Sequence, residues 1–66
     1  MPSHAELSAL TSSLDELTAR LTALAESADG RQQAELAAEL YGVERSLQGA
    51  LRRLRRVVDT EDRRRS

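Results

Sequence analysis

The sequence lacks cysteine, and phenylalanine, tryptophan, isoleucine, asparagine and lysine are absent as well. Without cysteine the chain has neither a disulfide framework nor a thiolate metal site. His4 is the only histidine, and the sequence offers no matched set of a nucleophile and a base. We expect His4 to be a solvated residue of the first helical turn. These absences predict a protein that is not an enzyme and that needs no cofactor or metal.

Long apolar runs are also missing, because none reaches the roughly 18 residues that span a bilayer. The N-terminal residues show neither the basic start nor the apolar stretch of a signal peptide. All ten basic residues are arginine, and alanine and leucine dominate the rest. This bias is compatible with a GC-rich bacterial genome, so we expect a cytoplasmic bacterial protein without a membrane partner. With 66 residues, the chain has room for one small domain.

Two series of apolar residues recur at alternating gaps of three and four, the spacing of a helix that packs along one edge. The first series is Leu7, Leu10, Leu14, Leu17, Leu21 and Leu24, and the second is Leu36, Leu40, Val43, Leu47, Ala50, Leu54 and Val57. The second series is offset by two residues from the continuation of the first, which is about 200° around a helix axis. One straight helix would bury opposite sides in its two halves. The sequence therefore predicts an all-α fold, an antiparallel two-helix hairpin with coiled-coil-like packing.

The residues between the two series give approximate helix bounds. Ser3 and Glu6 form a capping-box pattern at the start of a helix over 4–27. Asp29 and Gly30 predict a turn at 28–30, with Gly30 in the left-handed conformation that ends helices. A second helix is expected over 31–58, followed by a frayed, arginine-rich tail over 59–66. With this turn, Asp15 would lie near Arg45.

A lone hairpin cannot bury both apolar series. Leu51 and Val58 widen the apolar stripe of the second helix, and Thr18 and Ala25 flank the leucines of the first with small groups. A wide stripe is typical of a four-helix bundle. We therefore expect dimerisation into a four-helix bundle, although a different helical partner would meet the same requirement. The residues expected to be most buried are Leu14, Leu17, Leu40 and Leu47.

Charge divides the chain into an acidic and a basic part. Residues 1–44 contain eight acidic residues and two arginines, whereas residues 45–66 contain eight arginines and three acidic residues. The arginine cluster consists of Arg52, Arg53, Arg55 and Arg56. One interpretation is a phosphate-binding surface for nucleic acid. The other is structural, because arginines near a helix C-terminus favour the helix dipole and can pair with acids of the first helix.

A strip of small residues along the second helix is the other candidate site. It consists of Ala38, Tyr41, Gly42, Arg45 and Gly49, which include two glycines and the only aromatic residue. Small residues allow close approach of a partner helix, although such glycines can also be merely tolerated outside the core. The sequence thus favours a small, non-enzymatic helical interaction or regulatory module that binds itself and another protein. The alternative is a nucleic-acid-binding regulator that uses the arginine cluster.

Overall fold

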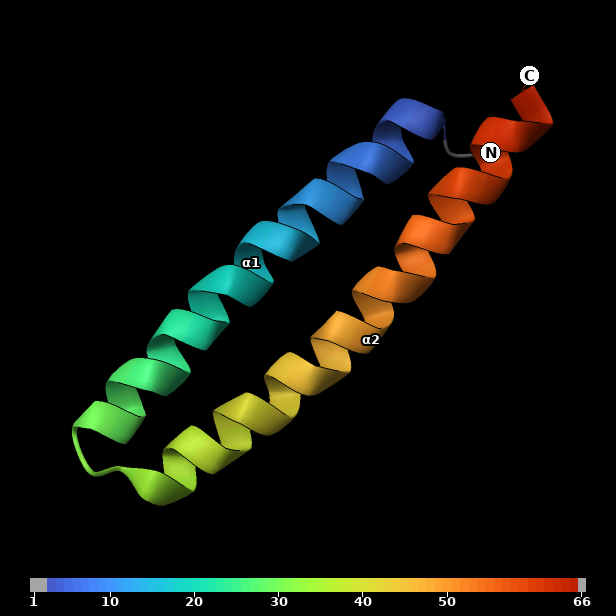
Figure 1. The fold of residues 1–66 in the computed structure, drawn as a ribbon. Helices are drawn as coiled ribbons and strands as arrows, with labels where there is room; N and C mark the ends of the chain where they lie inside the picture. The colour runs from blue at the N-terminus through green and yellow to red at the C-terminus, as the bar shows by residue number, and fades with distance from the viewer. Residues whose placement is uncertain (1–2, 66) are drawn as a thin grey trace.

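Two long α-helices and a short turn make up the computed structural model, which describes residues 3–65 (Figure 1). Helix α1 covers His4–Gly30, and α2 covers Ala34–Arg65. The helices lie side by side and antiparallel, in a rod that measures 51 Å along its length and 16 by 15 Å across. The predicted all-α hairpin is confirmed. Neither helix holds a stretch long and apolar enough to cross a bilayer, as far as the structure describes the chain.

The N-terminus of α1 is capped as the sequence indicates. Ser3 has an extended backbone, and its hydroxyl accepts a hydrogen bond from the backbone N–H of Glu6 at 3.1 Å. The same hydroxyl lies 3.4 Å from the Glu6 carboxylate. This cap satisfies one of the N–H groups that an α-helix leaves without an intrahelical partner.

The turn lies three residues later than the sequence indicates. Gly30 is helical, and the left-handed residue is Gln32, with φ 62°. The backbone N–H of Gln33 donates to the carbonyl of Ala28 at 2.9 Å, and that of Gln32 donates to Asp29 at 3.1 Å. This pair of bonds is the Schellman motif, which satisfies the last carbonyls of a helix. Its left-handed position is filled by glutamine instead of glycine.

Helix α2 also departs from the expected bounds. It begins at Ala34 instead of 31, and it stays helical to Arg65, through the segment expected to be a frayed tail; Ser66 lies outside the described residues. The added turns of α2 pack beside the start of α1, where Asp62 lies 3.4 Å from His4. Because a helix gains most of its stability from packing, this contact with α1 explains the longer α2.

Three contacts between the helices define their register. A carboxylate oxygen of Asp15 lies 3.4 Å from an Arg55 nitrogen, and the Thr22 hydroxyl donates to Glu44 at 2.7 Å. The third contact is that between His4 and Asp62. Asp15 therefore contacts Arg55, whereas the sequence had suggested a contact with Arg45. The later turn shifts the pairing of every residue.

The contact between the helices is a stripe of buried and half-buried side chains with gaps of three and four, which we call the inner stripe. It consists of His4, Leu7, Thr11, Leu14, Thr18, Leu21, Ala25 and Ala28 of α1 with Ala37, Leu40, Glu44, Leu47, Leu51, Leu54, Val58 and Glu61 of α2. The most deeply buried members are small, except Leu51: Ala25 and Leu51 are fully buried, and Thr18 is 1% exposed. Small residues in α1 let the α2 backbone approach closely.

Threonines can occupy the inner stripe because their hydroxyls are satisfied within α1. Thr18 donates to the carbonyl of Leu14 at 2.7 Å, and Thr11 donates to that of Leu7 at 2.8 Å. A buried hydroxyl without a partner would cost free energy, whereas a bond to the carbonyl one turn back removes that cost. What remains for the neighbouring helix is a small apolar surface.

Alternate members of the two predicted apolar series are not buried. Leu17, expected among the most buried residues, is 53% exposed, and Leu14, Leu40 and Leu47 are half-buried. Every second residue of each series lies in the inner stripe. On α1 the rest of the stripe is formed by the neighbouring column of Thr11, Thr18 and Ala25, and not by the other leucines. The helices are therefore rotated relative to the expected packing, and one column of large apolar residues on each helix is left outside.

Candidate interaction surface

The exposed columns form what we call the apolar face. It consists of Leu10, Leu17 and Leu24 of α1 with Leu36, Val43, Ala50 and Val57 of α2. Its six large side chains are between 44% and 61% exposed. Within each column, consecutive members are seven residues apart, and each directly precedes a residue of the inner stripe. The column on each helix is thus turned by about 100° from the inner stripe, at about 100° per residue.

Both columns lie on the same side of the hairpin. The rotation from the inner stripe to the exposed column has the same sense along each chain. Because the helices run antiparallel, this rotation brings the two columns to one side; in a parallel pair they would lie on opposite sides. In the observed register, Leu17 lies level with Ala50, and Leu24 lies level with Val43. The hairpin therefore presents one continuous apolar surface two helices wide.

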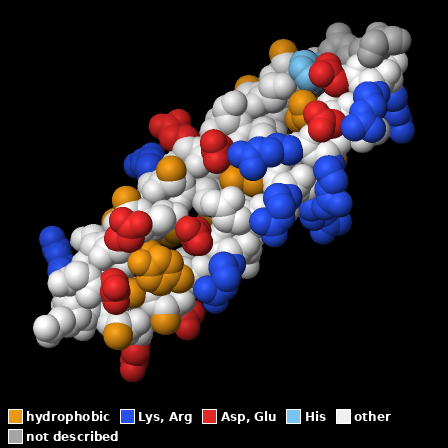
Figure 2. Space-filling view, in the orientation of Figure 1, with side chains coloured by type: hydrophobic (Ala, Val, Ile, Leu, Met, Phe, Trp, Pro, Cys, Tyr) orange, Lys and Arg blue, Asp and Glu red, His pale blue; other side chains and the backbone are white. Residues whose placement is uncertain are grey.

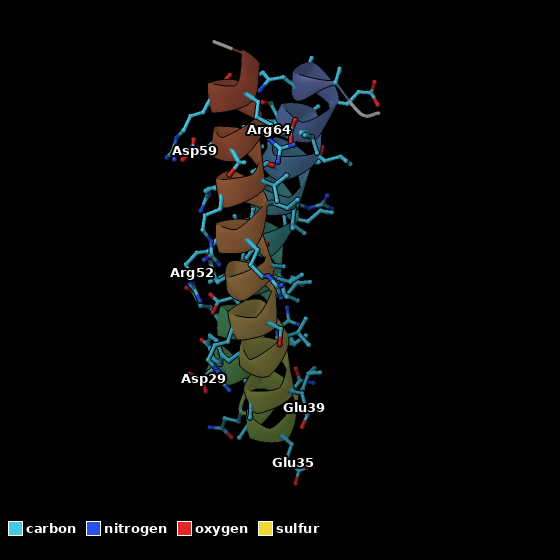
Figure 3. The ribbon with its side chains drawn as sticks, turned by 90° about the vertical axis from the view of Figure 1, so that its right-hand side faces the viewer. Asp29, Glu35, Glu39, Arg52, Asp59 and Arg64 are labelled. Atoms are coloured by element: carbon cyan, nitrogen blue, oxygen red, sulfur yellow. The ribbon has the colours of Figure 1, made fainter. Side chains whose placement is uncertain are left out.

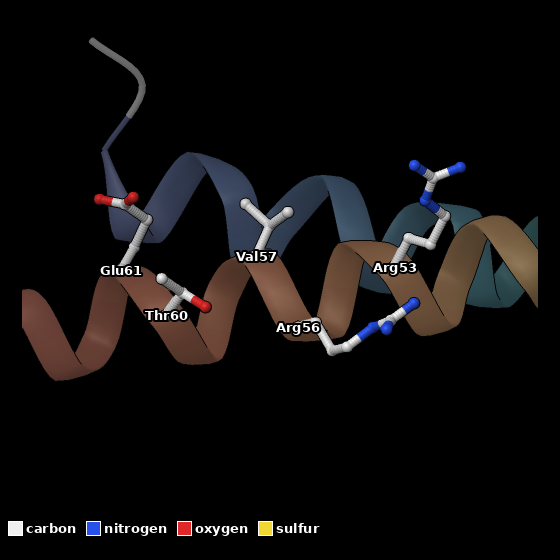
Figure 4. A pocket seen from close by; sticks show the side chains of 5 residues that line it. All are labelled: Arg53, Arg56, Val57, Thr60 and Glu61. Atoms are coloured by element: carbon white, nitrogen blue, oxygen red, sulfur yellow. The ribbon is translucent and has the colours of Figure 1, made fainter.

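Polar residues form the outer rim of the apolar face. Along α2 the rim is Glu39, Ser46, Arg53 and Thr60, each exposed. Figure 4 shows that Arg53 and Val57 project from the same side of α2. A shallow hollow at this place is lined by Arg53, Arg56, Val57, Thr60 and Glu61. The first four stand at i, i+3, i+4 and i+7, the set that forms a hole for a side chain of a facing helix.

The opposite side of the hairpin, which we call the polar face, has a different chemistry. It consists of Ser8, Asp15, Thr22 and Asp29 of α1 with Tyr41, Gln48, Arg55 and Asp62 of α2. The Asp15–Arg55 pair joins the helices there, and each side chain of this pair is more than half exposed. Such a pair stabilises a fold by about 0–1 kcal/mol. The polar face closes the hairpin with charges and hydroxyls and offers little apolar surface.

Tyr41 is half-buried on the polar face, in acidic surroundings. Loss of solvent raises the pKa of its phenol, and the negative charges of Asp29, Glu26 and Glu44 raise it further. The phenol is therefore neutral at physiological pH, able to donate a hydrogen bond.

The predicted strip of small residues lies on the outer side of α2, away from the apolar face. Ala38 and Arg45 are exposed, whereas Tyr41, Gly42 and Gly49 are half-buried. A Cβ added to Gly42 would lie 3.8 Å from a guanidinium nitrogen of Arg45, and one added to Gly49 would lie 3.8 Å from Arg52. These arginines thus lie over the glycines, and the five residues share one side of the helix.

The arginine cluster is exposed but does not form a single surface. Arg52, Arg55 and Arg56 line one open hollow, although Arg55 also pairs with Asp15. Arg53 lies elsewhere, at the rim of the apolar face.

Charge is distributed unevenly along the rod. Acidic side chains gather toward the turn, and arginines dominate toward the other end (Figure 2). In Figure 3, Asp29, Glu35 and Glu39 lie toward the turn, Arg52 lies near the middle of the rod, and Asp59 and Arg64 lie toward the open end. The antiparallel fold thus sets the acidic middle of the chain at one end and most of its arginines toward the other.

His4 is half-buried, in contrast to the solvated position expected. Its Nδ1 lies 3.4 Å from Asp62, and its Nε2 lies 3.4 Å from the Ser8 hydroxyl. The histidine thus ties the start of α1 to the end of α2. In the described part of the chain, no three histidine, cysteine, aspartate or glutamate side chains gather as metal ligands would.

Fold and surface together define a class, an antiparallel two-helix hairpin with one apolar face and one polar face. No protein-family model matches the chain, and no curated protein or solved structure matches it either. The function is therefore argued from the surfaces themselves. The sequence did contain the signal for the apolar face, since its residues are alternate members of the two apolar series.

Proposed function

We propose that the chain is a non-enzymatic helical interaction module that acts through protein–protein binding, and that it dimerises into a four-helix bundle through the apolar face. The observation that carries this proposal is the set of six large apolar side chains, 44–61% exposed, on one side of the hairpin. Monomeric soluble proteins rarely expose contiguous apolar patches larger than a few hundred Å². A second apolar face of the same kind covers this one.

The free energy available to such a dimer is of the size that association requires. Burying the exposed half of one such side chain contributes about 1 kcal/mol. Two copies bring twelve of these side chains, so the total is about 12 kcal/mol. The loss of rigid-body freedom on association costs about 4–15 kcal/mol. The two terms are of similar size, so we expect a dimer that dissociates and re-forms reversibly.

A partner other than a second copy would use the remaining outer surface. The strip of Ala38, Tyr41, Gly42, Arg45 and Gly49 points away from the apolar face, so dimerisation leaves it open. Its glycines give no stability to α2, and close approach of a second protein would use them. In this proposal the apolar face assembles the bundle, and the strip binds the regulated protein.

Sedimentation equilibrium of the wild type and two variants tests the proposal. Leu17→Gln places a polar side chain in the middle of the apolar face, and Ala23→Gln makes a comparable change on the exposed outer side of α1. We expect a dimer at micromolar concentration for the wild type and for Ala23→Gln, and a monomer for Leu17→Gln. A wild type that stays a folded monomer at every concentration contradicts self-association.

The alternative function is nucleic-acid binding. It is favoured by the hollow that Arg52, Arg55 and Arg56 line. Binding of this kind would depend steeply on salt, because each neutralised phosphate releases counterions. A labelled RNA hairpin and a labelled DNA duplex, titrated at 50 and 200 mM NaCl with the wild type and with Arg52→Gln/Arg56→Gln, separate the two functions.

A further inference from the structure

We propose that the second copy docks antiparallel, with the turns at opposite ends, so that α2 packs on α2 and Glu39 faces Arg53 of the second copy. This inference rests on the proposed dimerisation and names its geometry and the residues that select it.

Two symmetric arrangements bring the apolar faces of two hairpins together. In one, both turns lie at the same end and α1 packs on α2 of the second copy. In the other, the turns lie at opposite ends, α1 packs on α1 of the second copy, and α2 packs on its α2. The hairpin is acidic toward the turn and basic toward the open end (Figure 2). The first arrangement would set the two turn ends side by side, whereas the second sets each turn end against an open end, so that acidic residues near the turn meet arginines of the second copy.

The spacing of the apolar residues fits the second arrangement on both helices at once. A two-fold axis midway between Val43 and Ala50 sets Val43 against Ala50 of the second copy and Leu36 against its Val57. The observed register places that same axis midway between Leu17 and Leu24 of α1. Leu17 then lies against Leu24 of the second copy. One axis therefore aligns both columns without any shift of the helices.

The same axis aligns the charges of the α2 rim. Glu39 and Arg53 are equally distant from Ser46, which lies beside the axis. Glu39 of each copy therefore meets Arg53 of the other, and the dimer contains two such pairs. On α1, Arg20 faces Arg20 of the second copy, and these like charges repel. Glu16, one turn earlier, offsets part of this repulsion. The rim of α2 thus supplies the attraction that sets the direction.

A preformed hollow receives one of the apolar residues. Arg53, Arg56, Val57 and Thr60 line the hollow beside the end of the apolar face. In the antiparallel arrangement Leu36 of the second copy lies at Val57, so its side chain enters this hollow, whose lining residues are drawn in Figure 4. The same contact then fills the hollow and covers Leu36, which is 49% exposed in the single hairpin.

The area of the apolar face is sufficient for a specific dimer. From Leu36 to Val57 the face is about 32 Å long, at a rise of about 1.5 Å per residue. Two helices about 9 Å apart give it a width of about 18 Å. The two copies together would bury about 1,150 Å², close to the lower bound of about 1,200 Å² for standard-size stable interfaces and above about 1,000 Å².

Charge reversal tests the direction. Glu39 and Arg53 are about 21 Å apart along one helix, so they do not interact within one chain. We expect Glu39→Arg and Arg53→Glu each to raise the dimer dissociation constant about tenfold, because each sets like charges together at two places. The double variant Glu39→Arg/Arg53→Glu restores the pairs with reversed sign, so its dissociation constant should return to within about threefold of the wild-type value.

The outcomes separate the inference from the function on which it rests. If the wild type dimerises and Leu17→Gln does not, but the two charge reversals add up in the double variant, the antiparallel arrangement is wrong and the interaction module stands. If the wild type never dimerises, both fail. Cross-linking gives an independent measurement: Ser46→Cys copies, beside the axis, should be joined by a short bis-maleimide. Thr60→Cys copies lie at opposite ends and should not be; efficient joining of Thr60→Cys would overturn the arrangement.

Discussion

The inner stripe and the apolar face use the residues of α1 in opposite ways. Toward α2 the helix turns small side chains, with Thr18 at 1% and Ala25 at 0% exposure. One column of its leucines points elsewhere, since Leu10 and Leu24 are 60% and 61% exposed. Rotating α1 by one column would bury these leucines against α2 in place of the small residues. The observed packing instead keeps the helices close and leaves the leucines exposed.

This comparison shows that burial in one chain need not follow side-chain size. Leu7, Leu14 and Leu21 lie between the two columns and contribute to both surfaces. A column of small residues on one side gives close packing within the hairpin, and a column of leucines on the other side is exposed. Buried and exposed apolar surface are thus separated around the axis of a single helix.

Leu51 and Leu17 give the largest predicted difference between the two surfaces. Leu51 is fully buried in the inner stripe, so Leu51→Ala should lower the free energy of unfolding by about 2–5 kcal/mol. Leu17→Ala, in the apolar face, should cost about 1 kcal/mol or less in the monomer, because half of the side chain is already in water. Urea unfolding at a protein concentration below the dimer dissociation constant measures both values.

The same pair of variants can break the comparison. Equal losses for Leu51→Ala and Leu17→Ala in the monomer would show that α1 packs with its leucine column inward. At high protein concentration the Leu17→Ala loss should increase, since the wild type then gains stability from association.

Thr18 gives the next largest effect. A leucine in its place has no room, because the helices approach closely where Thr18 is 1% exposed. Thr18→Leu should therefore destabilise the hairpin by about 1–3 kcal/mol through overpacking. Ala23→Leu is a control, since Ala23 is exposed on the outer side of α1. Thermal unfolding of the two variants compares them, and a Thr18→Leu protein as stable as the wild type would show that the close approach is not required.

The sequence predicted the hairpin because the spacing of its apolar residues excluded one straight helix. It did not predict which columns would face inward, because Leu7, Leu14 and Leu21 have a column of small residues on one side and a column of leucines on the other. The threonines were the available signal: Thr11 and Thr18 can each bond the carbonyl one turn back, which lets a polar residue be buried. The exposed leucines were read as core since periodicity gives no preference between two neighbouring columns.

The turn was placed too early for a similar reason. Asp29 and Gly30 are typical of a helix end, but Ala25 and Ala28 continue the inner stripe, and α1 stays helical through Gly30. The left-handed position then falls on Gln32, which nothing in its residue type indicates. The strip was predicted from residue type and spacing, but its place on the outer side of α2, and the separation of Arg53 from Arg52 and Arg56, required the register of the hairpin.

The turn gives a smaller and stabilising effect. Gln32 has φ 62°, a conformation that costs a residue with a Cβ about 1 kcal/mol more than glycine. Gln32→Gly should raise the free energy of unfolding by up to about 1 kcal/mol, less the entropy that glycine adds to the unfolded chain. Gly30→Ala should also stabilise, by about 0.5–1 kcal/mol, because Gly30 is helical and a Cβ there has nothing within 4 Å. A loss of stability in Gly30→Ala, measured by thermal unfolding, would place the left-handed residue at Gly30 after all.

The smallest effect concerns the polar face and its dependence on pH. Desolvation, and then the charges of Asp29, Glu26 and Glu44, raise the pKa of Tyr41 in the folded chain. Its contribution to stability is therefore complete below the ordinary tyrosine value of about 10 and is lost as pH rises through the higher folded value. Tyr41 is the only tyrosine, so phenolate absorbance at 295 nm reports it alone. We expect the titration midpoint of Tyr41 in the folded chain to lie above that in the urea-unfolded chain. Asp29→Asn should lower this midpoint, whereas Leu17→Gln on the opposite face should leave it unchanged. Equal midpoints for the folded and unfolded chains would show that Tyr41 is not held among these carboxylates.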